Sequence, residues 1–335
     1  MSGEPDAAQS GEDRLIAQYF RPLAWHAGAF ALMDDAAAIA PPPGCDLVLK
    51  TDGIIGGVHF FSDDPPALIG KKALRVNLSD LAAKAARPLG FLLTLALPDQ
   101  IGDAWLASFS RGLGEDAEFF ECPLFGGDTD RTPGPITISI AVFGAVPHGR
   151  MLRRAGAQAD DCIVVTGTIG DASLGLALRG DASLAGKWSL NEEQRNQLQS
   201  RYLVPQPRVG VGEIFGRHAS AAMDISDGLA GDLAKLCRAS GVGAEVHAAR
   251  VPLSQAAGAA LGRAPTVIET VLTGGDDYEI LAAVPAGKVE TLRKEAAARG
   301  VAVTEIGTMR AGDSVRVLDQ DGNPLAFARP SFSHF

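Results

Sequence analysis

The chain has 335 residues, of which 46% are hydrophobic and 21% are charged, as expected for a globular protein of about two domains. Its formal net charge of −10 argues against a nucleic-acid binder, which needs a basic surface. The four cysteines lie far apart without a Cys-x-x-Cys pair, so neither a disulfide framework nor a zinc site is expected. The polar N-terminus does not resemble a signal peptide, and no apolar run could span a membrane. These features predict a cytoplasmic protein that binds neither nucleic acid nor membrane.

The first half of the chain is expected to alternate strands with helices. Residues 1–11 are expected to be disordered. Helices are predicted where apolar residues recur at helical spacing, and strands where short apolar runs end in turn residues. The predicted helices are 12–20, 66–86 and 103–120, and the predicted strands are 46–55, 89–98, 122–130 and 134–147. The third strand is expected to run into a Gly-Asp turn.

The second half begins after a polar, basic, turn-rich segment, residues 148–161, which is the best candidate for a linker. We therefore predict an N-terminal domain over 12–147 and a C-terminal domain over 148–335, both of α/β or α+β class. Strands are predicted over 162–170, 266–285, 303–309 and 314–319, and helices over 171–179, 191–200 and 287–300 and after residue 228.

Aspartates recur in segments of glycine and small residues, which we interpret as turns. Asp beside Gly is ordinary turn chemistry, so each segment alone needs no functional explanation. Together they offer many carboxylates to a hard cation such as Mg²⁺, which shares one or two carboxylates with substrate phosphates. The residues are Asp34 and Asp35, Asp52, Asp80, Asp128 and Asp130, Asp224 and Asp227, and Asp276 and Asp277 with Glu279. The set indicates a phosphate-handling, Mg²⁺-dependent enzyme.

The segment "DISDGLAGDL" (224–233) has more polar residues than a helix start needs. Ser226 or Asp227 is expected to cap the following helix, since such side chains accept hydrogen bonds from the free N–H groups of a first turn. A cap uses one side chain. The cap therefore leaves at least one further carboxylate of this segment without a structural explanation.

Several other kinds of site lack their motifs. The chain has no GxxxxGK[ST] phosphate loop, no GxGxxG after a predicted strand, no HExxH and no GxSxG. The six histidines are isolated from one another, and a lone histidine such as His59 is more often a surface or packing residue than a ligand.

A series of motifs occurs in the order typical of one enzyme family. They are "DDAAAI" (34–39), "KTDGIIGGVHF" (50–60), "KKALRVNLSDLAAKAARP" (71–88), "FGGDTDR" (125–131), "VTGTIGDASLGLA" (165–177), "MDISDGLAGDL" (223–233) and "TGGDDYE" (273–279). From about residue 12 to the C-terminal "FSHF", the chain resembles the thiamine-monophosphate kinases of the aminoimidazole ribonucleotide synthetase superfamily. "VNLSDLAA" and "GGDT" are shared across that superfamily, whereas the spacing of "TDG…VHF", "ISDGL" and "GGDDYE" is closer to the thiamine enzymes.

The resemblance implies a fold of two α/β domains. It implies that the N-terminal domain binds ATP and Mg²⁺ and that two chains form a homodimer through this domain. It implies ATP-dependent conversion of thiamine monophosphate to thiamine diphosphate. The implied metal ligands are Asp35, Thr51, Asp52, Asp80, Asp128, Asp224 and Asp227. The implied nucleotide contacts are Gly127, Asp128, Arg154 and Ser226, and the implied contacts to the thiamine moiety are His59, Asp276 and Phe332. Asp128, Asp227 and Arg154 are expected to neutralise charge during phosphoryl transfer.

Three positions depart from the family pattern. Met33 and Asp276 stand where the family usually has Gly and Glu, so the backbone at 33 and the reach of the carboxylate at 276 are expected to differ. Asp277 or Glu279 could compensate for the shorter side chain of Asp276. Lys50 replaces the small hydroxyl residue that often precedes Thr51, and its ammonium group could bind a phosphate.

The implied reaction explains why carboxylates and cations would be needed. The acceptor is a phosphate whose second pKa is about 6, so at neutral pH it is mostly a dianion and needs no general base. The obstacle is repulsion between two anions, which Mg²⁺ held by carboxylates and an arginine would reduce. Phe332 could stack on the thiazolium or pyrimidine ring, although a terminal aromatic residue can equally serve packing.

Two alternatives remain open. The chain could be another enzyme of the superfamily, one that activates an amide, selenide or carbamoyl group with ATP. It could also be a non-catalytic sensor of thiamine phosphates or nucleotide, for which Met33 and Asp276 are the sequence hints.

Overall fold

The computed structural model describes residues 11–329 and residue 331. The predicted disorder of residues 1–11 lies almost entirely outside the described residues, as does Phe332. The described chain divides into two compact units. Unit 1 contains the residues up to 43, together with 49–77 and 88–144, and unit 2 contains 44–48, 78–87 and the residues from 145 onward.

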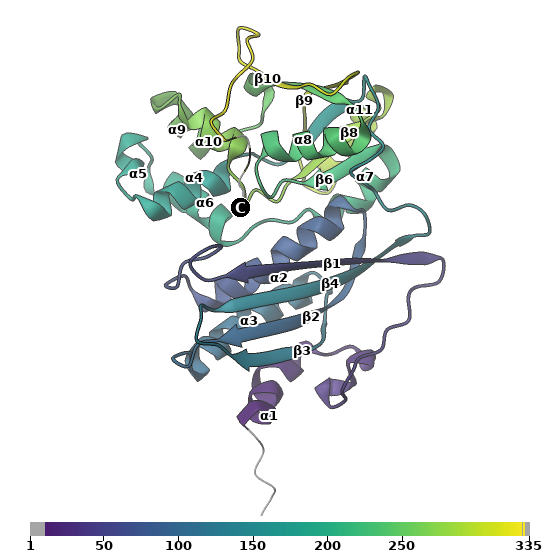
Figure 1. Cartoon of the computed structure of the whole chain (residues 1–335), viewed down its shortest axis with the longest axis vertical. Coiled ribbons are helices and arrows are strands. Elements are labelled where there is room, and N and C mark those ends of the chain that lie inside the picture. Colours follow the sequence, from purple (N-terminus) through teal and green to yellow (C-terminus); the bar gives the residue numbers. More distant parts are fainter. Residues whose placement is uncertain (1–10, 330, 332–335) are drawn as a thin grey trace, which may run out of the picture. The chain divides into compact units, whose positions relative to one another are not determined.

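Unit 1 is built on a four-stranded sheet in the order β1-β4-β2-β3, with α2 and α3 on one of its faces (Figure 1). β2 pairs in parallel with β3. Residues Phe91, Leu93 and Leu95 of β2 are at most 3% exposed, whereas Leu92 between them is 42% exposed, so one face of this sheet is packed and the other is open. The elements are β1 (Cys45–Ile55), α2 (Pro66–Ala83), β2 (Arg87–Leu97), α3 (Asp103–Phe119), β3 (Leu124–Arg131) and β4 (Thr137–Pro147).

The chain enters unit 1 through a series of short helical turns. These are α1 (Gly11–Leu15), η1 (Ile16–Phe20), η2 (Arg21–Leu23) and η3 (Ala27–Leu32). Phe30, Ala31 and Leu32 all have positive φ, with values of 48°, 55° and 55°. Arg21 steadies this left-handed segment, because its Nε donates to the Ala31 carbonyl oxygen at 3.1 Å.

Unit 2 is built on a six-stranded mixed sheet in the order β10-β7-β9-β5-β8-β6. β5 is antiparallel to both of its neighbours, and β10 is parallel to β7. The strands are β5 (Cys162–Thr166), β6 (Ala221–Asp224), β7 (Gly243–His247), β8 (Ile280–Val284), β9 (Val303–Arg310) and β10 (Val315–Leu318). The helices are α4 (Asp171–Gly180), α5 (Leu184–Lys187), α6 (Glu192–Leu203), α7 (Gly212–His218), α8 (Leu229–Ser240), α9 (Gln255–Arg263), α10 (Val267–Thr273) and α11 (Val289–Ala297).

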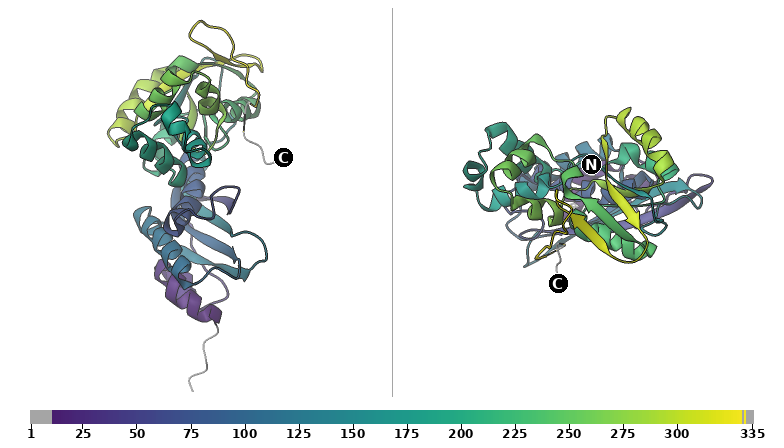
Figure 2. Two further views of the ribbon diagram at one scale, coloured as in Figure 1. Left: turned by 90° about the vertical axis from the view of Figure 1, so that its left-hand side faces the viewer. Right: turned by 90° about the horizontal axis from the view of Figure 1, so that it is seen from above.

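Helices cover both faces of this second sheet, as the two orientations of Figure 2 show. Ile163 and Val165 of β5 pack into a core with α4, α6, α8, α9 and α10. Val164, between them, packs on the other side with α7 and α11. A strand buried on both faces must be apolar at every position, which explains the continuous run "CIVV" that marks β5 in the sequence.

Most predicted elements are present, but the strand expected over 266–285 is wrong in its first part. Residues Val267–Thr273 form α10, and the strand β8 begins only at Ile280. The segment "VIETVLT" has β-branched residues that suggested a strand. Its buried side chains, Val267, Val271 and Leu272, lie on one helical face against the core, so packing overrides local propensity. The elements α5, α7, α9, β6 and β7 were not predicted.

The segment 148–161 contains no helix or strand, although Leu152 and Ala157 in it are buried in the cores of unit 2. The assignment of ATP, metal and dimer functions to residues 12–147 stays a prediction. No helix in the described part of the chain is both long and apolar enough to cross a membrane.

Candidate functional site

The interpretation of the aspartate-rich segments as turns is wrong for three of them, which lie instead in the elements predicted over 46–55, 66–86 and 122–130. Asp52 lies within β1, Asp80 within α2, and Asp128 within β3. The glycine beside Asp128 serves close packing, because a Cβ at Gly127 would lie 1.8 Å from the carbonyl oxygen of Leu93 on β2. Gly127 therefore allows β2 and β3 to approach closely, where we had expected a Gly-Asp turn.

Unit 1 holds a cavity of about 630 Å³ that brings three predicted site residues together. Asp35, Gly127 and Asp128 line it, with Asp34 beside them. Its remaining lining includes side chains of β2, β3, β4 and the turns before residue 40, among them Leu92, Phe125 and Phe143. A cavity lined by both acidic and aromatic residues can accept a ligand with polar and apolar parts.

Thr51 and Asp52 lie in unit 1 but do not line this cavity. The Thr51 hydroxyl donates to the carbonyl oxygen of Ile140 at 3.1 Å, and the Asp52 amide donates to Asn77 Oδ1 at 2.9 Å. Lys50, which we expected to be available for a phosphate, places its ammonium 3.1 Å from Asp52 Oδ1.

His59, also in unit 1, follows β1. The Ile55 amide donates to its Nδ1 at 3.0 Å, so the imidazole presents Nε2 as its second polar atom.

Asp80 and Asp224 form a carboxylate pair in unit 2. The Asp224 side chain is buried at the end of β6 and accepts a hydrogen bond from the Ser79 hydroxyl at 2.8 Å. Burial, followed by the negative charge of Asp80, raises the pKa of Asp224 to about 7. Among the described residues no group of three or more His, Cys, Asp and Glu side chains is arranged as a complete metal site. Two mutually repelling carboxylates nevertheless match the partial protein ligation that Mg²⁺ commonly has, with water and phosphate supplying the other ligands.

The "DISDG" loop is organised differently from our expectation. α8 begins at Leu229 after Gly228, which has φ of 106°, and no described side chain caps its first turn. The prediction that Ser226 or Asp227 caps this helix is therefore wrong. Instead Asp232, one turn into α8, accepts hydrogen bonds from the amides of Ser226 and Asp227 at 3.0 and 2.9 Å.

Lys235 provides a cation to the same loop. Its ammonium donates to Asp232 Oδ1 at 2.8 Å and contacts Asp227 Oδ2. Burial raises the pKa of Asp232, and Lys235 opposes this effect. The carboxylate predicted to bind metal at Asp227 therefore has an ammonium partner in this structure.

The "GGDDYE" loop packs against the "DISDG" loop. The Asp276 amide donates to the Ser226 carbonyl oxygen at 2.9 Å, so a predicted substrate contact and a predicted nucleotide contact adjoin. A Cβ at Gly275 would lie 2.2 Å from that same oxygen, which is why only glycine fits there. Ser331, at the end of the described chain, places its hydroxyl 3.4 Å from the Asp227 carbonyl oxygen.

Arg154 is exposed, and its carbonyl oxygen accepts a hydrogen bond from Ser240 at 2.8 Å. The predicted site residues are thus divided between the units. Unit 1 contains Asp35, Thr51, Asp52, His59, Gly127 and Asp128, and unit 2 contains Asp80, Arg154, Asp224, Ser226, Asp227 and Asp276.

Comparison with known proteins identifies the family. Residues 33–146 match the family described as AIR synthase related protein, N-terminal domain, and residues 158–320 match the corresponding C-terminal domain. A thiamine-monophosphate kinase from Caulobacter vibrioides is 40% identical over 315 residues, which span 93% of this chain and 87% of the relative. The chain belongs to the thiamine-monophosphate kinase family.

Solved structures of this kinase family have the same fold. The thiamine-monophosphate kinase from Stenotrophomonas maltophilia aligns with a TM-score of 0.80 and 37% identity, over 88% of this chain and 91% of the other. AaThiL, solved in complex with AMPPCP and TMP, aligns with a TM-score of 0.75 and 31% identity, over 92% of this chain and 97% of the other. The predicted two-domain fold of the kinase family is therefore confirmed.

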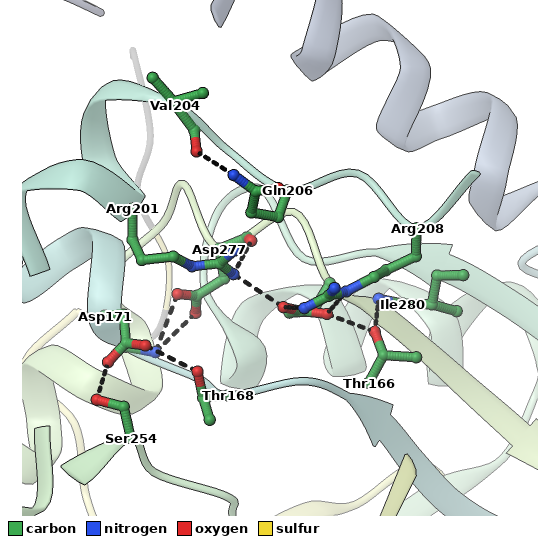
Figure 3. Close-up of polar contacts among 12 residues, drawn as sticks. Thr166, Thr168, Asp171, Arg201, Val204, Gln206, Arg208, Ser254, Asp277 and Ile280 are labelled. Atoms are coloured by element: carbon green, nitrogen blue, oxygen red, sulfur yellow. Dashed lines mark hydrogen bonds and ion pairs between the residues drawn. The ribbon is translucent and has the colours of Figure 1, made fainter. Parts of the chain in front are cut away.

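Sequence reasoning missed the side chains that support these two loops. These are Asp232, Lys235 and the two arginines that bind Glu279, Arg201 and Arg208 (Figure 3). Glu279 itself was expected to be able to compensate for the shorter side chain of Asp276, but it is buried and bound by these arginines. Asp232 and Lys235 lie at helical spacing after the "DISDG" segment. This spacing could have indicated that their side chains contact the loop. The arginines lie more than 70 residues before Glu279, so no local pattern connects them.

Proposed function

We propose that this protein transfers the γ-phosphoryl group of ATP to the phosphate of thiamine monophosphate, forming ADP and thiamine diphosphate. One observation carries the proposal: nearly the whole chain aligns, at 31% identity, with a relative that binds an ATP analogue and TMP. In the proposed in-line transfer, the bond from the γ-phosphorus to the ADP oxygen breaks as a bond to the acceptor phosphate oxygen forms.

The chain's own residues would mainly bind, position and neutralise. The acceptor is already a dianion near neutral pH, so no residue has to remove a proton. Arg154 would offset phosphate charge, and the cavity beside Gly127 and Asp128 would take part in nucleotide binding. Asp276 and His59 would contact the thiamine moiety.

Mg²⁺ would reduce repulsion between the two phosphate groups when bound. The paired carboxylates of Asp80 and Asp224 support a cation site in unit 2. Burial and then the charge of Asp80 raise the pKa of Asp224, and a divalent ion would stabilise both carboxylates in their charged form. In unit 1, Asp35 and Asp128 line one cavity and would bind Mg²⁺ together with Thr51 and Asp52. In unit 2, Asp227 would also bind Mg²⁺. We further propose that the protein is a cytoplasmic homodimer.

The first experiment follows product formation directly. Purified protein is incubated with ATP, Mg²⁺ and thiamine monophosphate, and thiamine diphosphate is measured by chromatography, with free thiamine as a parallel acceptor. Diphosphate formed only from the monophosphate supports the proposal, and EDTA should abolish it. Ligand binding without ADP formation would instead favour a sensor, and ADP formed only with an amide, selenide or carbamoyl acceptor would favour another enzyme of the superfamily.

A further inference from the structure

The loop that carries Asp276 has a backbone conformation that its residues disfavour. Asp276 has φ of 69° and Tyr278 has φ of 51°, both in the left-handed region. Aspartate tolerates this region, but a bulky tyrosine there is a genuine outlier. Such conformations persist only where the surrounding structure enforces them, and they are concentrated at ligand-binding sites.

Backbone pairing with the "DISDG" loop provides part of this enforcement. The amides of Asp276 and Tyr278 donate to the carbonyl oxygens of Ser226 and Ile225 at 2.9 and 2.8 Å. The Ile225 amide in turn donates to the carbonyl oxygen of Glu279 at 2.9 Å. Three hydrogen bonds therefore extend the pairing of β6 with β8 through the left-handed residues.

Side chains on either side of Tyr278 anchor the loop. Both Asp277 carboxylate oxygens accept from the Gly170 amide, at 2.9 and 3.0 Å. Glu279 is fully buried and accepts from the Thr166 hydroxyl at 2.6 Å, from Arg201 at 2.8 Å and from two nitrogens of Arg208 at 2.6 and 2.5 Å (Figure 3).

The backbone at Gly167 lies directly against the cluster formed by Glu279, Arg201 and Arg208. Gly167 has φ of 57°, and a Cβ there would lie 2.2 Å from Glu279 Oε1 and 2.5 Å from Arg208 Nη2. The Tyr278 hydroxyl lies 3.2 Å from Asp276 Oδ1, so the residue held next to Glu279 also contacts the Asp276 carboxylate.

Stability alone is a poor explanation for the cluster. A buried ion pair is weak evidence for stability, because desolvation of the charges opposes their attraction and apolar residues often serve as well. The cluster does what apolar residues cannot: four donor atoms hold the Glu279 carboxylate in one orientation. A planar arginine fork with two hydrogen bonds is suited to that task, and lysine is not an equivalent replacement.

We propose that Glu279, Arg201 and Arg208 are positioning residues that hold segment 276–278, in which Asp276 and Tyr278 are left-handed, and so set the position of the Asp276 carboxylate for the thiamine moiety. The inference rests on the proposed function, in which Asp276 contacts that moiety. It predicts that the cluster affects recognition of thiamine monophosphate through Asp276, and that it leaves recognition of ATP unchanged.

A double-mutant cycle tests this dependence. Arg208→Lys keeps the charge but loses the fork, and Asp276→Ala removes the carboxylate that the fork would position. Each variant should raise the KM for thiamine monophosphate about tenfold, as expected for a weakened hydrogen bond to a charged group, while the KM for ATP stays within about twofold. The double variant should resemble Asp276→Ala, because a carboxylate that is absent cannot be mispositioned.

If the double variant raises the KM for thiamine monophosphate by the product of the two single effects, the proposal is overturned, since Arg208 would then act independently of Asp276. An equal rise in the KM for ATP would also overturn it. If Arg208→Lys folds poorly, Glu279→Gln can be used instead to weaken the cluster. Its effect on the KM for thiamine monophosphate should likewise be absent when Asp276 is already replaced by Ala.

The matched control is Asp116→Asn in unit 1. It weakens another buried Arg–carboxylate pair, in which Arg75 contacts Asp116 at 2.5 and 2.9 Å. This variant should lower the melting temperature and leave the KM for thiamine monophosphate unchanged; a raised KM would show that lost stability alone produces the effect.

Calorimetric binding of thiamine monophosphate distinguishes failure of this inference from failure of the proposed function. If the wild-type protein forms no diphosphate, the proposed function fails. The double-mutant cycle is then evaluated from the dissociation constants of thiamine monophosphate in place of its KM values. If the wild-type protein binds no thiamine monophosphate, both are refuted.

Discussion

Replacing Asp224 with Asn should remove a pH-dependent part of the stability of the metal-free protein. Asp224 is only 4% exposed, and burial and Asp80 raise its pKa from the usual 3.8 to about 7. Asparagine has nearly the same shape and retains an oxygen that can accept the Ser79 hydrogen bond, but it carries no charge. The substitution therefore isolates the effect of ionisation.

The sign follows from proton binding. With a raised pKa, the folded state holds the Asp224 proton more tightly than the unfolded state does, so stability falls as the pH rises from about 4 through about 7. The slope approaches about 1.4 kcal/mol per pH unit in that window. Between pH 5 and pH 8 the wild-type protein should therefore lose roughly 3 kcal/mol more stability than Asp224→Asn.

Urea unfolding in EDTA measures this difference. Trp188 is buried in the core of unit 2. With Trp25 and Trp105 replaced by Phe in both proteins, its fluorescence reports on unit 2. Addition of Mg²⁺ at pH 8 should stabilise the wild-type protein and leave Asp224→Asn nearly unchanged. Parallel pH dependences in EDTA would refute the raised pKa, and equal stabilisation by Mg²⁺ would remove Asp224 from the proposed metal site.

Three further predictions concern the same loops and strands. Asp128→Asn and Asp227→Asn should each lower kcat at least about a hundredfold in folded protein, as judged by circular dichroism, and a near-normal rate would remove that residue from the site. Lys235→Met should make the melting temperature more sensitive to Mg²⁺, because a cation can then replace the ammonium beside Asp227; an unchanged response would argue against competition. Gly127→Ala should destabilise by about 2–3 kcal/mol through its contact with β2, whereas Gly180→Ala, with no neighbour within 4 Å, should not; equal melting temperatures would contradict the packing argument.

The local elements could mostly be predicted because side-chain periodicity is a property of neighbouring residues. The apolar run of β5 and the helical spacing in α2 and α3 led to the right element types. The segment 267–273 did not, since β-branched residues favour strands locally but here are buried along one helical face. The strand predicted over 122–130 continues through Gly126–Asp130, where we had expected a Gly-Asp turn, because Gly127 has no side chain and lets β2 approach.

The motifs in the chain were sufficient to identify the family, its two-domain fold and the residues proposed for the site, because these depend on residue types in a fixed order. The partners of those residues depend on packing between distant segments. Ser79 and Asp224 are 145 positions apart, and Thr166 and Glu279 are 113 positions apart, yet each pair shares a hydrogen bond. Whether a carboxylate faces a lysine, two arginines or another carboxylate is settled by how strands and helices pack, and that arrangement sets its pKa and its orientation.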